Sequence, residues 1–416
     1  MKVFANITWL LLERGAIILV GLVANVILAR SLGVKGFGEF QYAISVFNIF
    51  LAVTYICGAE VLVPALCASS DIQYKKKLLV NSFLLRLAAS FFSFIMLCSL
   101  AWFYLAESQK SLIVILGLML FFKEPFGVMI AWLQANTNNR PSSIAQVLVS
   151  GLKLVAIAIL FFLGFSSVLL YGSIWVLEAL ALAIIFIIYY RIYLRGTEVQ
   201  SFDWPEFRRL FRAGVPFWGG LVAMYLVQKV DRLLLNELAS PAELGIYAAA
   251  VQVTENLNLI GAVVVASIAP HFIYSNISLG LVKRRIVGLF MFMIALGFAI
   301  SFGLMIFANL IVFVLYGPSF AESASLLKLL AVVNILYFGD LALSAYVNKY
   351  ALGQWQLVKW LIVLAIVVGA AYGLIPRYGV DGAVYSLVLG YLSALALGFL
   401  VLVSNSDGRW GDRGKY

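Results

Sequence analysis

The sequence predicts an all-α, polytopic membrane protein with about twelve transmembrane helices. Hydrophobic residues make up 64% of the chain and charged residues 12%, whereas soluble domains average about 25% charged residues. Apolar stretches follow one another almost end to end, and about 20 such residues span the ~30 Å hydrocarbon core. Because backbone groups in lipid must bond within their own segment, we expect these stretches to be helices.

Twelve spans are expected, with ends placed to within a few residues. The first six are Ile7–Ala29, Phe40–Pro64, Leu78–Ala106, Ser111–Leu133, Ser143–Phe165 and Val168–Tyr190. The second six are Gly214–Leu235, Leu244–Pro270, Ile286–Tyr316, Leu326–Val347, Leu357–Ile375 and Val380–Ser404. Asn309 marks a candidate break in the ninth.

The net charge of +10 is explained by topology. Seventeen Lys and Arg side chains outside the spans fall on one side of the predicted membrane and four on the other. This bias places both termini in the cytoplasm and removes the reason to expect nucleic acid binding. With three cysteines and a single histidine, the chain offers neither a disulfide scaffold nor a cluster for a metal or a catalytic triad. We therefore expect no enzyme activity and no cofactor.

Internal matches predict two related halves. Gly38 and Gly245 lie 207 positions apart, as do Tyr171 and Tyr378, and Lys153 and Lys359 lie 206 apart. Biased composition could explain each match alone, but the near-constant offset favours a repeat. The expected domains are a six-helix bundle at 1–190, a cytoplasmic linker at 191–213 with an interfacial helix, a second bundle at 214–404 and a cytoplasmic tail at 405–416. Six spans per half give both halves the same orientation, as in transporters that alternate access to a central site.

Charged residues within the spans are the main functional signal, since each costs about 2.5–3.5 kcal/mol at mid-bilayer. Some have structural explanations: Lys123 and Glu124 beside Pro125 could form a local ion pair at a kink, and Asp231 with Arg232, Lys328 and Lys359 could reach the interface. Arg14 shares a helical stripe with Gly21 and Asn25. We predict a cationic, substrate-binding chamber that holds an anionic group such as phosphate, lined by Arg14, Arg86 and Lys153 and helped by Lys229, Arg232 and Lys359.

Acidic residues in the spans would balance this positive field or carry a coupling H⁺ or Na⁺. The candidates are Glu13, Glu60, Glu255 and Asp340. Burial raises the pKa of a carboxyl group and adjacent cations lower it, so both roles stay open. Glu13, next to Arg14, is equally a structural counter-ion or a proton carrier.

Local patterns in order along the chain resemble the polysaccharide (O-antigen type) flippases of the multidrug/oligosaccharidyl-lipid/polysaccharide exporter superfamily. They run from Ala29-Arg-Ser-Leu-Gly33 with Phe37-Gly38, through Leu210-Phe-x-x-Gly214-x-Pro216, Asp231-Arg232-x-Leu-Leu and Leu244-Gly-Ile-Tyr247-Ala with Pro270, to Leu315-Tyr-Gly317-x-x-Phe320 and Ile375-Pro376-x-Tyr-Gly379-x-x-Gly382-Ala383.

The resemblance implies two six-helix bundles in a V around a central cavity. It implies a flippase that moves undecaprenyl-pyrophosphate-linked oligosaccharide, such as O-antigen repeat units, across the bacterial inner membrane, with membrane lipids and the pathway's polymerase and glycosyltransferases as partners. Two alternatives remain. An ion-coupled drug antiporter of the same superfamily would favour an acidic lumen. A membrane enzyme of the pathway would favour a large outward loop, and every predicted outward connection is short.

Overall fold

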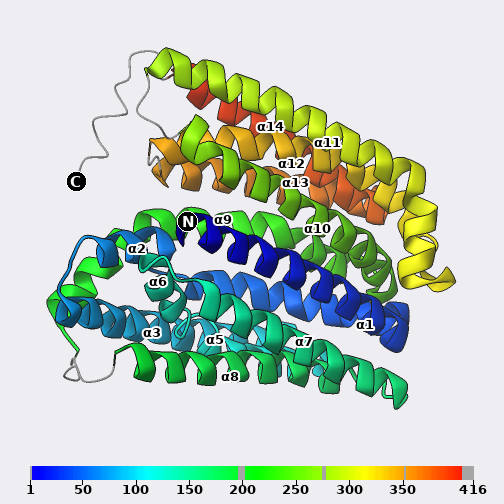
Figure 1. Ribbon diagram of the computed structural model, residues 1–416. Helices are drawn as coiled ribbons and strands as arrows, with labels where there is room; N and C mark the ends of the chain where they lie inside the picture. The colour runs from blue at the N-terminus through cyan, green and yellow to red at the C-terminus, as the bar shows by residue number, and fades with distance from the viewer. Residues whose placement is uncertain (1, 195–201, 274–277, 351–352, 405–416) are drawn as a thin grey trace. The chain divides into compact units, whose positions relative to one another are not determined.

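The computed structural model describes residues 2–194, 202–273, 278–350 and 353–404, and the regular elements in these ranges are all helical (Figure 1). The predicted all-α class is therefore confirmed. The chain divides into two compact units. Unit 1 comprises Met1–Gly33 and Glu39–Val222, and unit 2 comprises Val34–Gly38 and Ala223–Tyr416. The predicted bundle boundaries stay a prediction, and the predicted tail at 405–416 and linker residues 195–201 lie outside the described residues.

Unit 1 begins with α1 (Lys2–Thr54), which carries the first two predicted spans in one continuous assignment. Gly33 lies between them with φ of +66°, a left-handed conformation that glycine adopts without steric cost. The second span is completed by α2 (Ala59–Cys67), and α3 (Ile72–Tyr104) is the third. Asp71 caps α3 by accepting a hydrogen bond from the backbone N–H of Gln73 at 2.9 Å.

The fourth span is interrupted. It consists of α4 (Glu107–Gly117), α5 (Met119–Phe122) and α6 (Val128–Ala135), and residues 123–127 between α5 and α6 are non-helical. Pro125 explains the interruption, because proline lacks the N–H that a helix needs at that position. The predicted kink is therefore confirmed. Non-helical backbone at membrane depth must be buried in protein or line a cavity.

Three further helices contribute to unit 1, and the last of them continues into unit 2. α7 (Arg140–Phe162) and α8 (Val168–Tyr193) pack against each other, and α8 also packs on α4. α9 (Trp204–Leu238) contains the predicted interfacial segment and the seventh span, with a bend of 48° between Val215 and Trp218. Its first turns are fixed to α3 by an ion pair of 2.7 Å between Asp203 and Lys77.

Unit 2 contains α10 (Pro241–Phe272), α11 (Leu279–Tyr316), the short η1 (Pro318–Phe320), α12 (Ser323–Lys349), α13 (Gly353–Tyr378) and α14 (Val380–Ser404). A capping box of Ser240 and Glu243 starts α10. α11 runs through Asn309 without interruption, so the candidate break there is wrong. α12 is central, because α10, α11 and α14 all pack on it.

Residues Val34–Gly38 pack with unit 2 although they follow the first span. The ring of Phe37 is buried and lies 5.9 Å from that of Phe320. A Cβ on Gly38 would meet the carbonyl of Pro241, and one on Gly245 would meet the carbonyl of Val34. The two glycines predicted as repeat equivalents therefore permit the close approach of their own segments.

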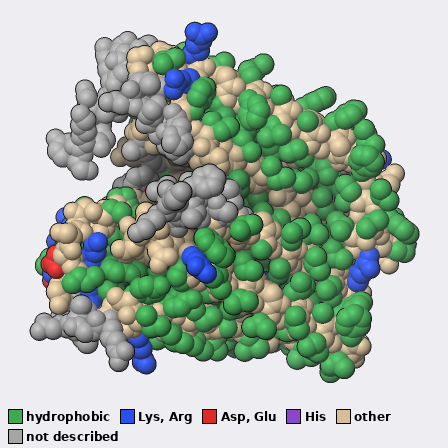
Figure 2. Space-filling view, viewed as in Figure 1, with side chains coloured by type: hydrophobic (Ala, Val, Ile, Leu, Met, Phe, Trp, Pro, Cys, Tyr) green, Lys and Arg blue, Asp and Glu red, His purple; other side chains and the backbone are tan. Residues whose placement is uncertain are grey.

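Among the described residues, nine helices are long and apolar enough to cross a membrane, or ten if the bent α9 counts as one span. Twelve is an approximate count, because α1 carries two predicted spans and the fourth is divided over three short helices. Apolar side chains cover much of the face shown in Figure 2, over α11 in unit 2 and over α7 and α8 in unit 1. This exterior is that of a multi-pass membrane protein.

Candidate functional site: a cationic cavity in unit 1

A cavity of about 270 Å³ lies within unit 1. Residues of α1, α3, α7 and α8 line it, together with the residues around the start of α2 and the broken fourth span. Its charged lining residues are Arg14, Arg86, Lys123 and Glu124. With three cations and one acid, the lining favours an anionic ligand. We call this space the unit 1 cavity; its other polar lining residues are Tyr55, Gln134 and Gln146.

Arg86 is bound tightly to the protein at the edge of this cavity. Its residue exposure is 2%, and its guanidinium donates to the carbonyl of Cys57 at 2.8 Å and to the carbonyl of Glu124 at 3.1 Å. It also lies 3.6 Å from the carboxylate of Glu124. Because these contacts join α3 to the start of α2 and to the broken span, Arg86 holds the cavity wall together.

Arg14 and Lys123 are different, since both are exposed side chains that line the cavity. Neither has an ion pair with any residue in the described part of the chain. Lys123 lies 6.0 Å from the centre of the Phe47 ring. The predicted local ion pair of Lys123 with Glu124 is wrong, because Glu124 pairs with Arg86. The signal that identifies Lys123 is a lysine in the middle of a span next to a helix-breaking proline.

Glu13 is buried beside Arg14 but is bound by neutral donors. Its carboxylate accepts hydrogen bonds from the hydroxyl of Ser143 and, at 2.9 Å, from the side-chain amide of Gln146. Both partners lie on α7, and Gln146 also lines the unit 1 cavity. Glu60, on the first turn of α2, is exposed. No ion pair connects Glu60 to a residue that the structure describes.

Lys153 does not line this cavity. It forms an ion pair of 2.9 Å with Glu178 of α8 and lies 5.1 Å from the ring centre of Trp175. Ser150 also donates to Glu178 at 3.1 Å. Of the three cations predicted to act together, the structure thus places Arg14 and Arg86 around one cavity and Lys153 in a separate interhelical pair.

The predicted site residues at the start of unit 2 form a compact charge cluster between α9 and α10. Glu255 accepts from Lys229 at 2.8 Å and from Arg232 at 2.7 Å. Asp231 accepts from the hydroxyl of Tyr247 at 2.6 Å. Asp231 and Arg232 are each 2% exposed, so the interpretation that they reach the membrane interface is wrong. We call these five residues the unit 2 charge cluster; its two cations and two acids balance.

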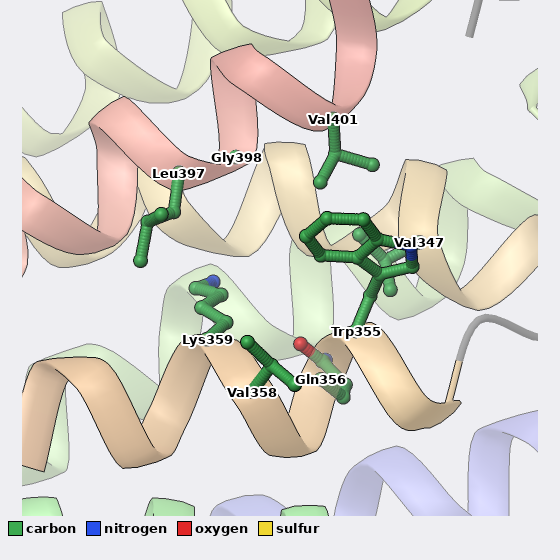
Figure 3. Close-up of a pocket in the computed structure, with 8 residues that line it drawn as sticks. All are labelled: Val347, Trp355, Gln356, Val358, Lys359, Leu397, Gly398 and Val401. Atoms are coloured by element: carbon green, nitrogen blue, oxygen red, sulfur yellow. The ribbon is translucent and has the colours of Figure 1, made fainter. Parts of the chain in front are cut away.

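The remaining predicted site residues, Lys359 and Asp340, form an ion pair that links α13 to α12. The ammonium of Lys359 donates to the carboxylate of Asp340 and lies 3.4 Å from the hydroxyl of Ser344. Both residues are buried, which excludes an interfacial position for Lys359. A slot of about 10 Å³ adjoins Lys359 (Figure 3), where Lys359 and Trp355 of α13 lie opposite residues of α14. Its space is that of a single water molecule.

Comparison with known proteins assigns the chain to a family. Residues 3–275 match the family described as polysaccharide biosynthesis protein. The chain belongs to this family. The resemblance predicted from the sequence is therefore confirmed. No curated protein matches the chain at a significant level.

Solved structures with the same fold include transporters of two kinds. An inward-facing multidrug resistance MATE family transporter of the MOP superfamily aligns with a TM-score of 0.71 and 15% identity, over 97% of this chain and 99% of that one. The lipid II flippase MurJ in an inward closed conformation aligns with a TM-score of 0.67 and 14% identity, over 97% and 90%. A mutant of the Vibrio cholerae MATE transporter VcmN gives 0.65 and 13%, over 98% and 97%. At identities of 13 to 15%, these similarities establish a shared fold alone.

Proposed function

We propose that this polysaccharide biosynthesis protein is a flippase. It moves undecaprenyl-pyrophosphate-linked oligosaccharide repeat units, such as O-antigen units, from the cytoplasmic to the periplasmic leaflet of the bacterial inner membrane. The protein forms and breaks no covalent bond in this process. Both termini are cytoplasmic, and the lipid tail stays in the bilayer while the polar head crosses by alternating access.

The charge of the unit 1 cavity carries this proposal. Arg14 and Lys123 face a space of about 270 Å³ without an acidic partner among the described residues. Unneutralised cations within a membrane protein are retained at a cost. A bound pyrophosphate group would offset this cost, since the group offers several charged oxygens to Arg and Lys donors. The family match to polysaccharide biosynthesis supports the same class of substrate.

The alternative is an ion-coupled antiporter for small molecules or drugs. The fold shared with a multidrug resistance transporter is consistent with this alternative. A cavity that selects cationic drugs requires acidic residues facing the ligand. Here the one acid among the charged lining residues, Glu124, is held by Arg86. The charge balance of the cavity thus favours the anionic lipid-linked substrate.

The proposed roles of the acids follow from their partners. Glu255 and Asp340 contact cations of their own unit, so we assign them to charge balance. Glu13 is bound by neutral groups, so it is the acid we propose for coupling to H⁺ or Na⁺, if transport is ion-driven. The pathway's polymerase and glycosyltransferases are the proposed partners at the membrane.

The test is transport in proteoliposomes. Labelled undecaprenyl-pyrophosphate oligosaccharide is incorporated, and its arrival on the outer leaflet is measured as cleavage by an added glycosidase. Protein-dependent cleavage is expected, and it should fall with the Arg14→Ala variant. Absence of cleavage with folded, correctly inserted protein, several glycans and imposed ion gradients would favour the antiporter.

A further inference from the structure

We infer that Lys123, at the break in the fourth span, is the principal binding residue for a diphosphate-type anion in the unit 1 cavity, with Arg14 as its second cation. This inference rests on the proposed function for its biological meaning and specifies the group that binds there. It reverses the prediction from the sequence, which assigned Arg86 to substrate binding and Lys123 to a local ion pair, because Arg86 is engaged with the protein itself.

The position of Lys123 results from the broken helix. α5 ends at Phe122 and α6 begins at Val128, so the lysine leaves the chain where regular helical packing stops, close to the middle of the predicted span. Lys123 and Gly127 both line the cavity. Backbone that is non-helical at this depth is tolerated where it lines a water-filled space.

Side chains, rather than the end of α6, supply the donors. The backbone N–H of Gly127 donates to the carbonyl of Lys123 at 3.2 Å, and that of Ile130 donates to the carbonyl of Gly127 at 3.0 Å. These bonds engage the N–H groups of Gly127 and Ile130 within the turn itself. The ammonium of Lys123 has its ring contact with Phe47 and no ion pair within the described part of the chain.

Arg86 adds an independent indication of a ligand at the same place. Its Nε atom is buried and has no hydrogen-bond partner among the described residues, although its terminal nitrogens are occupied. Buried donors in native proteins are normally satisfied. Because Arg86 lines the same cavity, an anion held by Lys123, or a water molecule in its shell, would supply the missing acceptor. The site then has two exposed cations, Arg14 and Lys123, and one buried donor, Nε of Arg86.

The contact of Arg86 with Glu124 explains why the ammonium of Lys123 has no acidic partner among the described residues and can bind a ligand. Glu124 is the next residue along the chain, yet its carboxylate lies 3.6 Å from the guanidinium of Arg86, and its carbonyl accepts from the same group. Arg86 thereby engages the acid next to Lys123 in the chain. An exposed lysine without an acid is suited to a ligand that enters and leaves.

The experiment measures binding of inorganic pyrophosphate to the purified full-length protein by isothermal titration calorimetry. Lys123→Gln should weaken binding about tenfold or more, because one charge-assisted contact is lost. Lys123→Arg should retain most of the affinity. The matched control is Lys110→Gln, which removes the same charge from an exposed pair with Glu107; its affinity should equal that of the wild type. Equal affinities of Lys123→Gln and Lys110→Gln, with both variants folded, would overturn the inference.

A second arm identifies the source of the anion. Farnesyl diphosphate carries the same group on a short lipid, and tighter binding than pyrophosphate, again lost in Lys123→Gln, would support a lipid-linked ligand. Failure of the wild type to flip oligosaccharide, with Lys123-dependent pyrophosphate binding intact, would remove the proposed function and leave this site. Normal flipping by Lys123→Gln, together with unchanged binding, would remove this site and leave the proposed function.

Discussion

The two units treat their membrane-embedded charges differently. In unit 2, Lys229 and Arg232 share Glu255, and Lys359 is paired with Asp340. Lys328, near the start of α12, is exposed and lines neither of the two described spaces. In unit 1, Arg86 and Lys153 are paired in the same way, but Arg14 and Lys123 face a cavity. Paired charges join neighbouring helices, and we propose that the unpaired cations of the unit 1 cavity serve a ligand.

Energetics support this division. A buried ion pair recovers the cost of desolvating its two charges mainly through its partner, so removing one member costs about 3–5 kcal/mol. A cation in a hydrated cavity retains part of its solvation, and removing it changes stability little. Stability and ligand binding should therefore respond to different residues, which makes the comparison open to experiment.

The largest expected effect is on the Asp340–Lys359 pair. Asp340→Ala leaves a buried ammonium without its carboxylate and should lower the free energy of unfolding by about 3–5 kcal/mol, measured by thermal denaturation in detergent. The double variant Asp340→Leu with Lys359→Met removes both charges and should recover much of this loss. A single variant as stable as the wild type would show that the pair carries no structural role.

Arg86 should be the next most sensitive position. Arg86→Gln removes donors to the carbonyls of Cys57 and Glu124 and should cost about 2–3 kcal/mol, since buried acceptors are left unsatisfied. The comparison is with Lys123→Gln, for which the expected loss is below about 0.5 kcal/mol. Both are measured in the same thermal assay, and equal losses would contradict the division of roles within unit 1.

Arg14→Ala should affect function without affecting the amount of protein. We expect export to fall about tenfold or more, because the cavity loses one of its two unpaired cations. The measurement is oligosaccharide flipping in proteoliposomes, normalised to inserted protein. A control is Lys328→Ala, an exposed cation of α12 in unit 2. Full activity of Arg14→Ala would remove this arginine from the site.

Among the ion pairs, the smallest effect is expected at the start of α9. Asp203 and Lys77 form an ion pair of 2.7 Å with side chains about one third exposed. Asp203→Ala should change stability by less than about 1 kcal/mol, and by less still at high salt, because exposed pairs are weak and screened. A loss as large as that of Asp340→Ala would mean that the segment is structurally as important as the buried pairs.

Much of the fold follows from the sequence because it depends on local chemistry. Apolar length set the spans and Pro125 set the break in the fourth, whereas the left-handed conformation of Gly33 between the first two was seen only in the structure. The common offset of Gly38 and Gly245 indicated equivalent segments, but their mutual packing became visible only in the structure. The cations within the spans were recognisable as costly, but Lys123 was assigned to a local ion pair and not to the chamber.

What only the tertiary structure decided is which acid each cation meets. Sequence proximity suggested Lys123 with Glu124, yet Arg86 from another helix takes that carboxylate. Lys153 likewise meets Glu178, and Lys359 meets Asp340. Such pairs depend on the rotation and vertical register of neighbouring helices, which arise from packing along their whole length. The sequence by itself therefore determined where charges enter the membrane, and the packing of helices determined which of them remain available to a ligand.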